Sequence, residues 1–391
     1  MIDFSLTDEQ RAIRDWVRTF VERELMPLEN EILRREREGH VPGLTAEETK
    51  SLRELARKSD FWGVDTPEEY GGMGLDPISV ALIETELGRT FASFRFGGSA
   101  DNILFHANEE QKERYLLPTI NGDRHSCFAI TEPGAGSDAK AIRTRAVRDG
   151  DEWVINGEKT FITGGEQADF TMVFAVTDQE KGANGGVTCF LVDRDMGWTS
   201  EPIDTMGERR PASLVFQDVR VPHENILGEE GQGFALAMQW IGKGRYMLPA
   251  RALGGCERLL GMAIDYSRTR ETFGEPIAER QAIQWMIADS QTDVEALRLL
   301  VLHAAWQVSQ GMDSRHAQSI AKLFGGVKAN EIVDRVMQIH GGMGYTRELP
   351  IERWYRDLRL LRIFEGTDEI QRRTIARDLL KGHVKVGATL S

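Results

Sequence analysis

Residues 143–163, RTRAVRDGDEWVINGEKTFIT, decide the fold because they interrupt an otherwise helical chain with short strands. Three parts of this stretch alternate apolar and polar side chains, as half-buried β-strands do: residues 143–147, 152–155 and 159–163. Asp149-Gly150 and Asn156-Gly157 lie between them, and both dipeptides are strong hairpin-turn signals. Strand-like segments continue at residues 170–176, 187–192 and 213–221. The stretch therefore predicts a small antiparallel β-domain in the middle of the chain.

The sequence on both sides of this region has helical periodicity. Near the start, Thr7 and Gln10 form a capping-box pattern before apolar residues at helical spacing. Further helices are expected at residues 46–58, 76–89, 109–117, 234–267, 277–308, 316–339 and 367–380. Pro249 should break or kink the helix at 234–267. The succession predicts an α+β fold, mostly α, with domains at residues 1–120, 121–232 and 233–391.

Composition narrows the classes of function. The chain has 391 residues and a net charge of −14, which argues against nucleic acid or an anionic membrane as the main partner. Cys127, Cys189 and Cys256 form no CxxC pair and the histidines have no metal-binding spacing, so we expect buried thiols and no metal site. Residues 1–10 lack a signal-peptide pattern, and no stretch approaches the ~20 apolar residues of a membrane span. A cytoplasmic protein is expected.

Residues 362–372, RIFEGTDEIQR, place a carboxylate in an unusual position. Glu365 lies between an aromatic residue and a glycine, just before an amphipathic helix. Desolvation disfavours the charged form of a carboxylate and raises its pKa, which makes it a better base near neutral pH. The alternative is that Glu365 only caps the following helix, where acidic residues are common.

A second segment, residues 130–138 with the sequence ITEPGAGSD, is a loop rich in backbone amides. Its glycines allow close approach of a ligand to the backbone, and its amides can bind anionic oxygens. The GxGxxG spacing and βαβ context of a dinucleotide-binding fold are missing. The alternative is that the glycines form only a tight turn and that the nearby Phe161 belongs to the core.

Seven segments spread along the chain resemble the acyl-CoA dehydrogenase family, over essentially the whole length. They are residues 67–74 (PEEYGGMG), 129–138 (AITEPGAGSD), 154–165 (VINGEKTFITGG), 216–234 (FQDVRVPHENILGEEGQGF), 270–274 (RETFG), 338–345 (QIHGGMGY) and 364–372 (FEGTDEIQR). The resemblance implies an N-terminal helical domain, a middle antiparallel β-domain and a C-terminal four-helix bundle. It also implies bound FAD and a dimer or tetramer, with a homotetramer expected. The reaction implied is α,β-dehydrogenation of an acyl-CoA to a trans-2-enoyl-CoA.

The resemblance also assigns roles to individual residues. Glu365 matches the base that removes the α-proton, while flavin N5 takes the β-hydride. Contacts with the isoalloxazine ring and pyrophosphate are implied for Phe128, Ile130, Thr131, Gly136, Ser137, Phe161 and Thr163. Contacts with the FAD of a neighbouring subunit are implied for Arg270, Thr272, Phe273, Gln281, Gln338, Gly341 and Gly342. Thr367 and Glu369 match residues near the adenosine or pyrophosphate, although Glu369 also suits the first turn of a helix. Substrate-side positions are Ser137, Arg245, Phe364 and Gly366.

Some positions leave alternatives open. Many relatives carry an acid near Gly242 that contacts the pantetheine arm, and this chain does not. Arg245 is either a substrate-side residue or one half of an ordinary buried ion pair. Phe91, Phe94 and Phe96 either shape the acyl pocket or belong to the core, and the core is favoured. The expected electron acceptor is an electron-transfer flavoprotein. The competing hypotheses are an acyl-CoA oxidase that uses oxygen, and a non-catalytic acyl-CoA-binding or assembly subunit.

Overall fold

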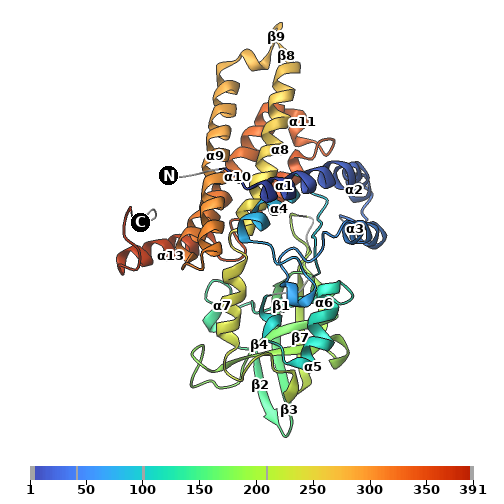
Figure 1. Ribbon diagram of the computed structural model, residues 1–391, viewed down its shortest axis with the longest axis vertical. Coiled ribbons are helices and arrows are strands. Elements are labelled where there is room, and N and C mark those ends of the chain that lie inside the picture. The colour runs from blue at the N-terminus through green and yellow to red at the C-terminus, as the bar shows by residue number, and fades with distance from the viewer. Residues whose placement is uncertain (1–4, 41–42, 99–101, 208–209, 388–391) are drawn as a thin grey trace. The chain divides into compact units, whose positions relative to one another are not determined.

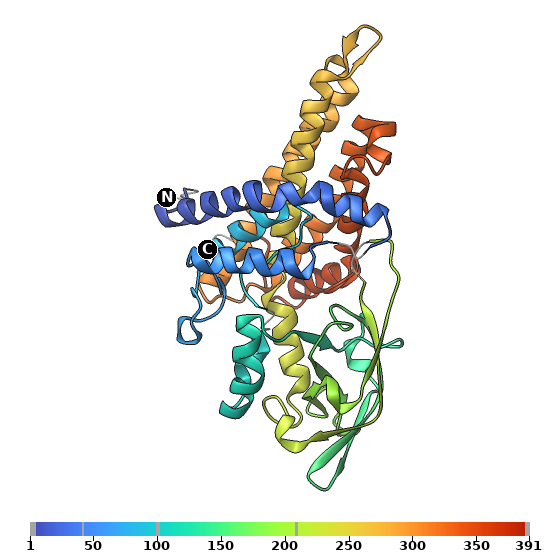
Figure 2. The same ribbon diagram turned by 90° about the vertical axis from the view of Figure 1, so that its right-hand side faces the viewer.

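The computed structural model describes residues 5–40, 43–98, 102–207 and 210–387 (Figure 1). The chain divides into two compact units. A helical unit takes the described residues up to Asp60, then Leu75–Arg95, and those from Gly244 onward. A sheet unit takes Phe61–Gly74 and the described residues from 102 to Lys243, together with Phe96–Gly98. Figure 2 shows the same ribbon after a rotation of 90° about the vertical axis.

The N-terminal helices begin where polar side chains cap them. The Thr7 hydroxyl accepts from the Gln10 amide and the Gln10 side chain accepts from the Thr7 amide, so the predicted capping box is present at the start of α1 (Asp8–Phe20). A π-helical turn, η1 (Val21–Leu25), and a 3-10 turn, η2 (Met26–Leu28), lead into α2 (Glu29–Arg37). A second capping box starts α3 (Ala46–Lys58), and Asp76 caps α4 (Pro77–Gly88).

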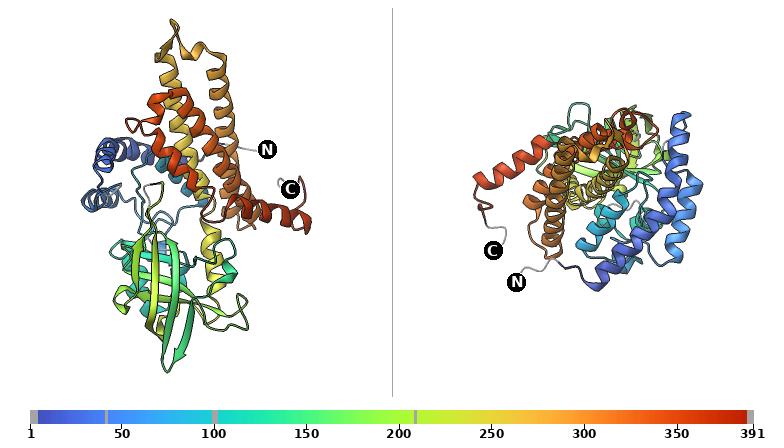
Figure 3. Two further views of the ribbon diagram at one scale, coloured as in Figure 1. Left: turned by 180° about the vertical axis from the view of Figure 1, so that it is seen from behind. Right: turned by 90° about the horizontal axis from the view of Figure 1, so that it is seen from above.

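Three long helices form the centre of the helical unit: α8 (Met247–Thr269), α9 (Gln281–Ser309) and α10 (Arg315–His340). They lie side by side in Figure 1 and in the rear view of Figure 3. A short hairpin of β8 (Glu271–Thr272) and β9 (Glu275–Pro276) joins α8 to α9. The chain then continues through α11 (Gly342–Tyr345), α12 (Ile351–Leu360) and α13 (Asp368–Leu380). The helices α9, α10 and α13 confirm the helical segments predicted at residues 277–308, 316–339 and 367–380 to within a few residues.

Close backbone contact joins α4 to α8. A Cβ atom on Gly88 would lie 1.9 Å from the Arg251 carbonyl oxygen, and one on Gly254 would lie 1.8 Å from the Thr85 carbonyl oxygen. Any side chain at either position would force the two helices apart. The pairing is extended by Arg251, whose guanidinium Nε is 2.8 Å from Glu84 Oε2.

The helix predicted at residues 234–267 is two helices. The first, α7, is Gly233–Lys243, and α8 begins at Met247 after a turn at residues 244–246. Pro249 therefore lies in the first turn of α8, where an amide N–H would have no partner within the helix. Pro249 is tolerated there without a kink, and the break precedes it.

Among its described residues, the sheet unit has seven strands: β1 (Ser126–Ala129), β2 (Arg145–Asp149), β3 (Glu152–Ile162), β4 (Phe170–Val176), β5 (Val187–Asp193), β6 (Thr199–Pro202) and β7 (Ala212–Pro222). Their order is β1-β4-β2-β3-β7-β6, with β5 paired to β4. Four neighbouring pairs are antiparallel, but β1 and β2 both run parallel to β4. The predicted β-domain is present and mainly antiparallel, and its two parallel pairs, β1 with β4 and β2 with β4, were not predicted.

One predicted hairpin is present and the other is not. Asp149 pairs with Glu152 across the turn between β2 and β3, which confirms the turn at Asp149-Gly150. Asn156-Gly157 instead lies inside the continuous strand β3, at a shift in register with β7. A Cβ on Gly157 would lie 2.5 Å from Thr144 Oγ1, so the glycine permits close approach of neighbouring backbone. The same dipeptide suits a turn or a bulge, and the sequence alone did not separate them.

Helical segments and aromatic residues complete the two cores. In the sheet unit, α5 (Glu109–Gln111), η5 (Lys112–Leu116) and α6 (Leu117–Asn121) follow one another, and Tyr115 packs on Phe170 with ring centroids 4.8 Å apart. Phe91, Phe94 and Phe96 are all buried, which confirms that they belong to the core. Within the described ranges, no helix is both long and apolar enough to cross a bilayer.

Candidate active site

Glu365 lies in the short connection between α12 and α13. Its backbone has φ +49°, and the following Gly366 has φ +89°, so two consecutive residues are left-handed. A left-handed conformation is unfavourable for a residue with a Cβ atom. The side chain of Gln371 bridges the two peptides that follow Glu365, because its Nε2 donates to the Glu365 carbonyl at 3.3 Å and to the Gly366 carbonyl at 3.1 Å. Glu365 is half-buried and does not cap α13.

The cap of α13 is Thr367, whose hydroxyl oxygen accepts from the Ile370 amide at 3.3 Å. Glu369 is exposed in the first turn, and its pKa is lowered because its own backbone amide and the Thr367 hydroxyl donate to it. Both residues thus serve the helix start in this structure. Their predicted contact with FAD stays a prediction.

Arg245 lies in the turn between α7 and α8, next to the Glu365 connection. A Cβ on its neighbour Gly244 would lie 3.7 Å from Glu365 Oε2. Burial lowers the pKa of Arg245, while the nearby Glu365 acts in the opposite direction. Its Nε is buried without a hydrogen-bond partner, and among the described residues it forms no ion pair within 4.0 Å. The ordinary ion-pair alternative is therefore not supported, and a guanidinium is held near the carboxylate.

The amide-rich loop follows β1 in the sheet unit. Glu132 and Ala135 exchange backbone hydrogen bonds of 3.1 and 3.0 Å, which close the loop. Gly136 and Ser137 are exposed, and within the described ranges their amides donate to no other group. Nothing lies within 4 Å of a Cβ built on Gly134 or Gly136. The loop thus presents free donors on an open side, as an anionic ligand requires.

A buried ion pair supports this loop from inside. Lys159 is fully buried, and its Nζ donates to Glu132 Oε1 at 2.8 Å, to the Phe174 carbonyl at 2.7 Å and to the Ile130 carbonyl at 3.2 Å. Glu132 also accepts from the amides of Arg143 and Thr144 at 2.6 and 2.9 Å. Burial acts to raise the pKa of Glu132, but the Lys159 ammonium and these hydrogen bonds keep it below its usual value. Burial lowers the pKa of Lys159 to about 8, so both groups are still mainly charged at pH 7. This pair was not predicted from the sequence, although a lysine at a buried strand position was a signal.

Phe161 and Thr163 lie beside the same loop. The Thr160 amide donates to the Thr131 carbonyl at 2.9 Å, which joins the end of β3 to the segment after β1. Phe161 has φ +57° in an irregular part of β3, and 61% of its surface is exposed. A bulge re-aims a side chain, and here it directs an aromatic ring away from the core. The alternative that Phe161 is a core residue is therefore wrong.

Phe128 and Ile130 lie in the same region, together with Trp240, which was not predicted from the sequence. Ile130 is buried, and Phe128 packs on Phe174 with ring centroids 4.8 Å apart. Trp240, on α7, stacks on Phe128 with centroids 4.0 Å apart and planes at 10°. Trp240 therefore fixes the ring of a predicted flavin contact.

The residues predicted to contact the FAD of a neighbouring subunit lie where α8 ends and α9 begins, and where α10 ends (Figure 1). Arg280 holds the hairpin there, since its guanidinium donates to the Thr272 carbonyl at 2.9 Å. Tyr266 and His340 stack with centroids 4.4 Å apart and join the ends of α8 and α10. The exposed residues of this set are Arg270, Phe273, Gln281, Gln338, Gly341 and Gly342, and Thr272 is half-buried. Arg270, Thr272, Phe273 and Gln281 thus lie at the connection between α8 and α9, and Gln338, Gly341 and Gly342 lie where α10 ends.

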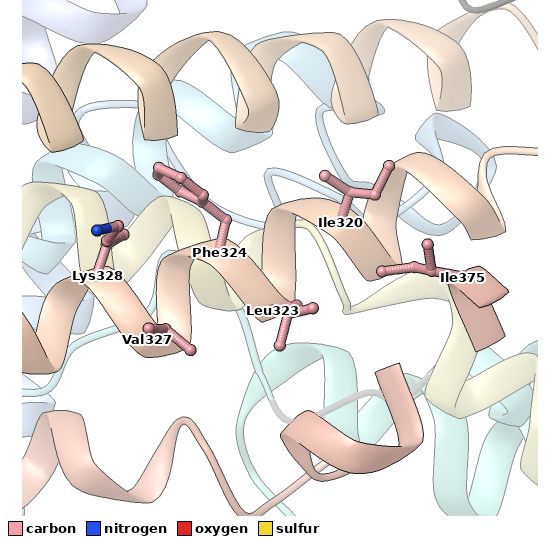
Figure 4. A pocket seen from close by; sticks show the side chains of 6 residues that line it. All are labelled: Ile320, Leu323, Phe324, Val327, Lys328 and Ile375. Atoms are coloured by element: carbon pink, nitrogen blue, oxygen red, sulfur yellow. The ribbon is translucent and has the colours of Figure 1, made fainter. Parts of the chain in front are cut away.

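A pocket of about 350 Å³ lies elsewhere in the helical unit (Figure 4). It is lined by Ile320, Leu323, Phe324, Val327 and Lys328 of α10 and by Ile375 of α13. None of these residues was predicted to bind substrate or flavin, and the lining has no converging polar groups. The pocket is therefore not the candidate active site.

Comparison with known proteins identifies the family. Models of the acyl-CoA dehydrogenase N-terminal, middle and C-terminal domains match residues 7–123, 127–219 and 231–380. The chain belongs to the acyl-CoA dehydrogenase family. It is 39% identical over 385 residues to a 3-(aryl)acrylate reductase of Clostridium sporogenes, covering 96% of this chain and 99% of that protein. It is 38% identical over 388 residues to the mouse mitochondrial short-chain specific acyl-CoA dehydrogenase, covering 97% and 92%.

A solved structure gives the same result for the fold. A chain in the structure described as the electron transferring flavoprotein of Acidaminococcus fermentans matches with a TM-score of 0.87 and 38% identity. The match covers 97% of this chain and 100% of that chain. The protein is therefore an oxidoreductase of a FAD-dependent family.

The residues present suit FAD. The free amides of Gly136 and Ser137 can receive pyrophosphate or ring oxygens, and the exposed Phe161 ring can pack on a flat heterocycle. Arg270 and the glycines at the end of α10 offer a guanidinium and open backbone for phosphate oxygens. The assignment of these particular residues to FAD stays a prediction.

Proposed function

We propose that the protein catalyses α,β-dehydrogenation of a saturated acyl-CoA, with Glu365 removing the α-proton. The observation that carries this proposal is the conformation of Glu365. A carboxylate in a left-handed, half-buried connection, with its next peptide hydrogen-bonded by Gln371 and a guanidinium nearby, is held in place against local backbone preference. Such strain persists where the surrounding structure over-determines it, which is typical of active sites.

The chain's own residues would perform three tasks beside the cofactor. Glu365 accepts the α-proton, and its carboxyl group must be ionised to do so. The amide donors after β1 and the exposed Phe161 bind and orient the cofactor. Bound FAD supplies the acceptor for the β-hydride. Arg245, charged and close to Glu365, favours the ionised carboxylate before the proton is taken.

The test is anaerobic reduction of the purified, FAD-loaded protein by a panel of acyl-CoAs, followed by absorbance of the oxidised flavin. Butyryl-, octanoyl-, isobutyryl- and 3-phenylpropionyl-CoA cover short, longer, branched and aromatic acyl groups. Glu365→Gln should slow reduction by on the order of 10²–10⁴-fold or more while FAD stays bound. A variant that reduces its flavin as fast as the wild type would show that Glu365 is not the base.

The acyl group and the electron acceptor form part of the same proposal. A short or compact acyl group is supported by the similarity to a short-chain specific relative. An electron-transfer flavoprotein is proposed as the electron acceptor. The support is that a chain similar to 97% of this protein occurs in a structure described as an electron transferring flavoprotein. Three domains at residues 1–120, 121–232 and 233–391, a homotetramer and a cytoplasmic location also remain proposals.

A second candidate is the reverse reaction on an aromatic substrate. It is favoured by the 39% identity to a 3-(aryl)acrylate reductase over almost all of both chains. In that case, reduced flavin in this protein should be reoxidised by an arylacrylyl thioester faster than the oxidised flavin is reduced by the saturated counterpart. The opposite ratio favours dehydrogenation.

A further inference from the structure

Lys322 is a buried lysine that the predicted chemistry does not use. It lies in the middle of α10 and only 1% of its surface is exposed. Helical periodicity places it opposite the apolar residues of Figure 4, on a face formed by small residues such as Gly326 and Ala329. Lysine is almost never buried in this way unless it is paired, because removing an ammonium from water is costly.

The partner of Lys322 is the carbonyl group of Gly366, in the peptide that joins Gly366 to Thr367. Its Nζ donates to the Gly366 carbonyl oxygen at 2.6 Å, and the same oxygen accepts from Gln371 Nε2 at 3.1 Å. Two side chains, one from α10 and one from α13, therefore hold one carbonyl group. Gln371 is itself fully buried. This double contact fixes the orientation of the Gly366–Thr367 peptide, directly after the two left-handed residues Glu365 and Gly366.

Lys322 also faces the charged groups around Glu365. The anions are Glu365 in the connection and Asp368 and Glu369 at the start of α13, while Arg245 is the nearby cation. Asp368 is shared with Arg362, whose Nε lies 2.7 Å from Asp368 Oδ2. Farther out, the Arg315 charge acts on Arg245. Burial lowers the pKa of Lys322 to about 8, so the ammonium is still the main form at pH 7.

We propose that Lys322 is a positioning residue for the base: it holds Glu365 in its left-handed conformation through the Gly366 carbonyl, and its charge keeps the Glu365 carboxylate ionised. This inference rests on the proposed role of Glu365 as base. It adds a second function to the contact, because a neutral donor would hold the peptide equally well but would not favour the carboxylate.

The proton step can be measured separately from hydride transfer. In methylthioacetyl-CoA a sulfur atom replaces the β-carbon, so the α-C–H bond can break and its proton can move to Glu365, but no β-hydride is available. The resulting enolate beside oxidised flavin should give a long-wavelength charge-transfer band. The pH at which half of the band has formed reports the competition between enolate and base for the proton. The holoenzyme is titrated with this analogue between pH 5 and 9.

Two substitutions separate the charge from the hydrogen bond. Lys322→Met keeps the length of the side chain and removes both, while Lys322→Gln keeps an N–H donor and removes only the charge. Lys328→Met is the control, because Lys328 is on the same helix and its ammonium pairs with Asp293 and Glu331, away from the Glu365 connection. FAD content and melting temperature are measured for every variant. If Lys322→Met does not fold, Lys322→Gln carries the test.

Loss of the charge should move the charge-transfer midpoint of both Lys322 variants by about one pH unit or more relative to the wild type. Lys322→Met should in addition slow flavin reduction by butyryl-CoA more than Lys322→Gln does, with little change in KM. A Lys322→Gln midpoint that coincides with that of Lys328→Met overturns the proposal. If Glu365→Gln still forms the band and reduces its flavin, the role of Glu365 fails first, and that result is distinct from an unshifted Lys322 variant.

Discussion

Replacing Lys159 with methionine should selectively destabilise the sheet beneath the amide-rich loop. The variant leaves Glu132 buried and charged without its ammonium partner, and the Ile130 and Phe174 carbonyls each lose a donor. Removing one partner of a buried ion pair costs about 3–5 kcal/mol. Glu132 keeps two backbone amide donors, at 2.6 and 2.9 Å, so we expect the lower half of that range. The corresponding acceleration of local opening is roughly 10²–10³-fold.

The assay is hydrogen exchange of the FAD-loaded protein, followed by mass spectrometry of peptides from β3 and β4. The matched control is Arg220→Met on β7, because Arg220 pairs with Asp149 and Glu152 while half or more of its surface is exposed. An exposed pair contributes only about 0–1 kcal/mol, so this variant should exchange almost as the wild type does. Equal exchange in Lys159→Met and Arg220→Met would refute the assignment of stability to the buried pair.

The stabilisation by the Lys159–Glu132 pair should also depend on pH in a defined direction. The pKa of Glu132 is lowered in the folded state, so its contribution to stability is present above its ordinary pKa and is lost as pH falls through the folded value. In Lys159→Met, protonation of Glu132 instead removes an unpaired buried charge. The difference in exchange rate between wild type and variant should therefore shrink on acidification. A difference that grows toward low pH would contradict a charged pair.

Three further predictions follow from single contacts. Gly366→Ala should slow flavin reduction on the order of 10²-fold, because a Cβ at this position would lie 2.6 Å from Gln371 Nε2. The control is Gly382→Ala, which should not slow it, because Gly382 also has a positive φ but nothing lies within 4 Å of its Cβ position. Tyr115→Phe removes a donor 2.7 Å from Asp193 Oδ2 and should lower the stability of the sheet unit by about 1–2 kcal/mol in urea unfolding. Burial lowers the pKa of His340, so the folded state binds fewer protons than the unfolded state does. The melting temperature should therefore decrease as the pH is lowered below about 6.5, and it should decrease less in His340→Gln.

Much of the fold was predictable because local signals and tertiary packing agree. The predictable features involve residues that are close in sequence: the capping box at Thr7, the helical spacing of apolar residues and the turn at Asp149-Gly150. The parallel pairing of β1 and β2 with β4 was not predictable, since it joins segments without a hairpin between them. The bulge at Gly157 was missed for a related reason. Its cause is the proximity of Thr144, which is a contact between strands and not a property of the dipeptide.

The candidate site divides in the same way. Motifs identified Glu365 and the loop after β1, because a carboxylate beside glycine and consecutive free amides are visible in the sequence. The supporting residues Lys322, Gln371 and Lys159 were not identified. Each of them bonds a residue that is distant in sequence: Lys322 is 44 residues from Gly366, Lys159 is 27 residues from Glu132, and Gln371 is 5 residues from Gly366. Only the fold shows which backbone carbonyl or carboxylate a buried ammonium meets.

Backbone strain supports the site independently of any resemblance. Within the described part of the chain, five residues other than glycine have positive φ: Asp60, Phe161, Asp218, Phe273 and Glu365. Aspartate tolerates this conformation, because its short side chain can bond locally. The other three are bulky or long side chains for which it is unfavourable, and all three are residues assigned to flavin or substrate. A protein that keeps left-handed phenylalanine and glutamate must stabilise them elsewhere, as Gln371 and Lys322 do for Glu365. Selection for folding alone gives no reason to retain such residues, whereas aiming a ring at a cofactor or a carboxylate at a substrate does.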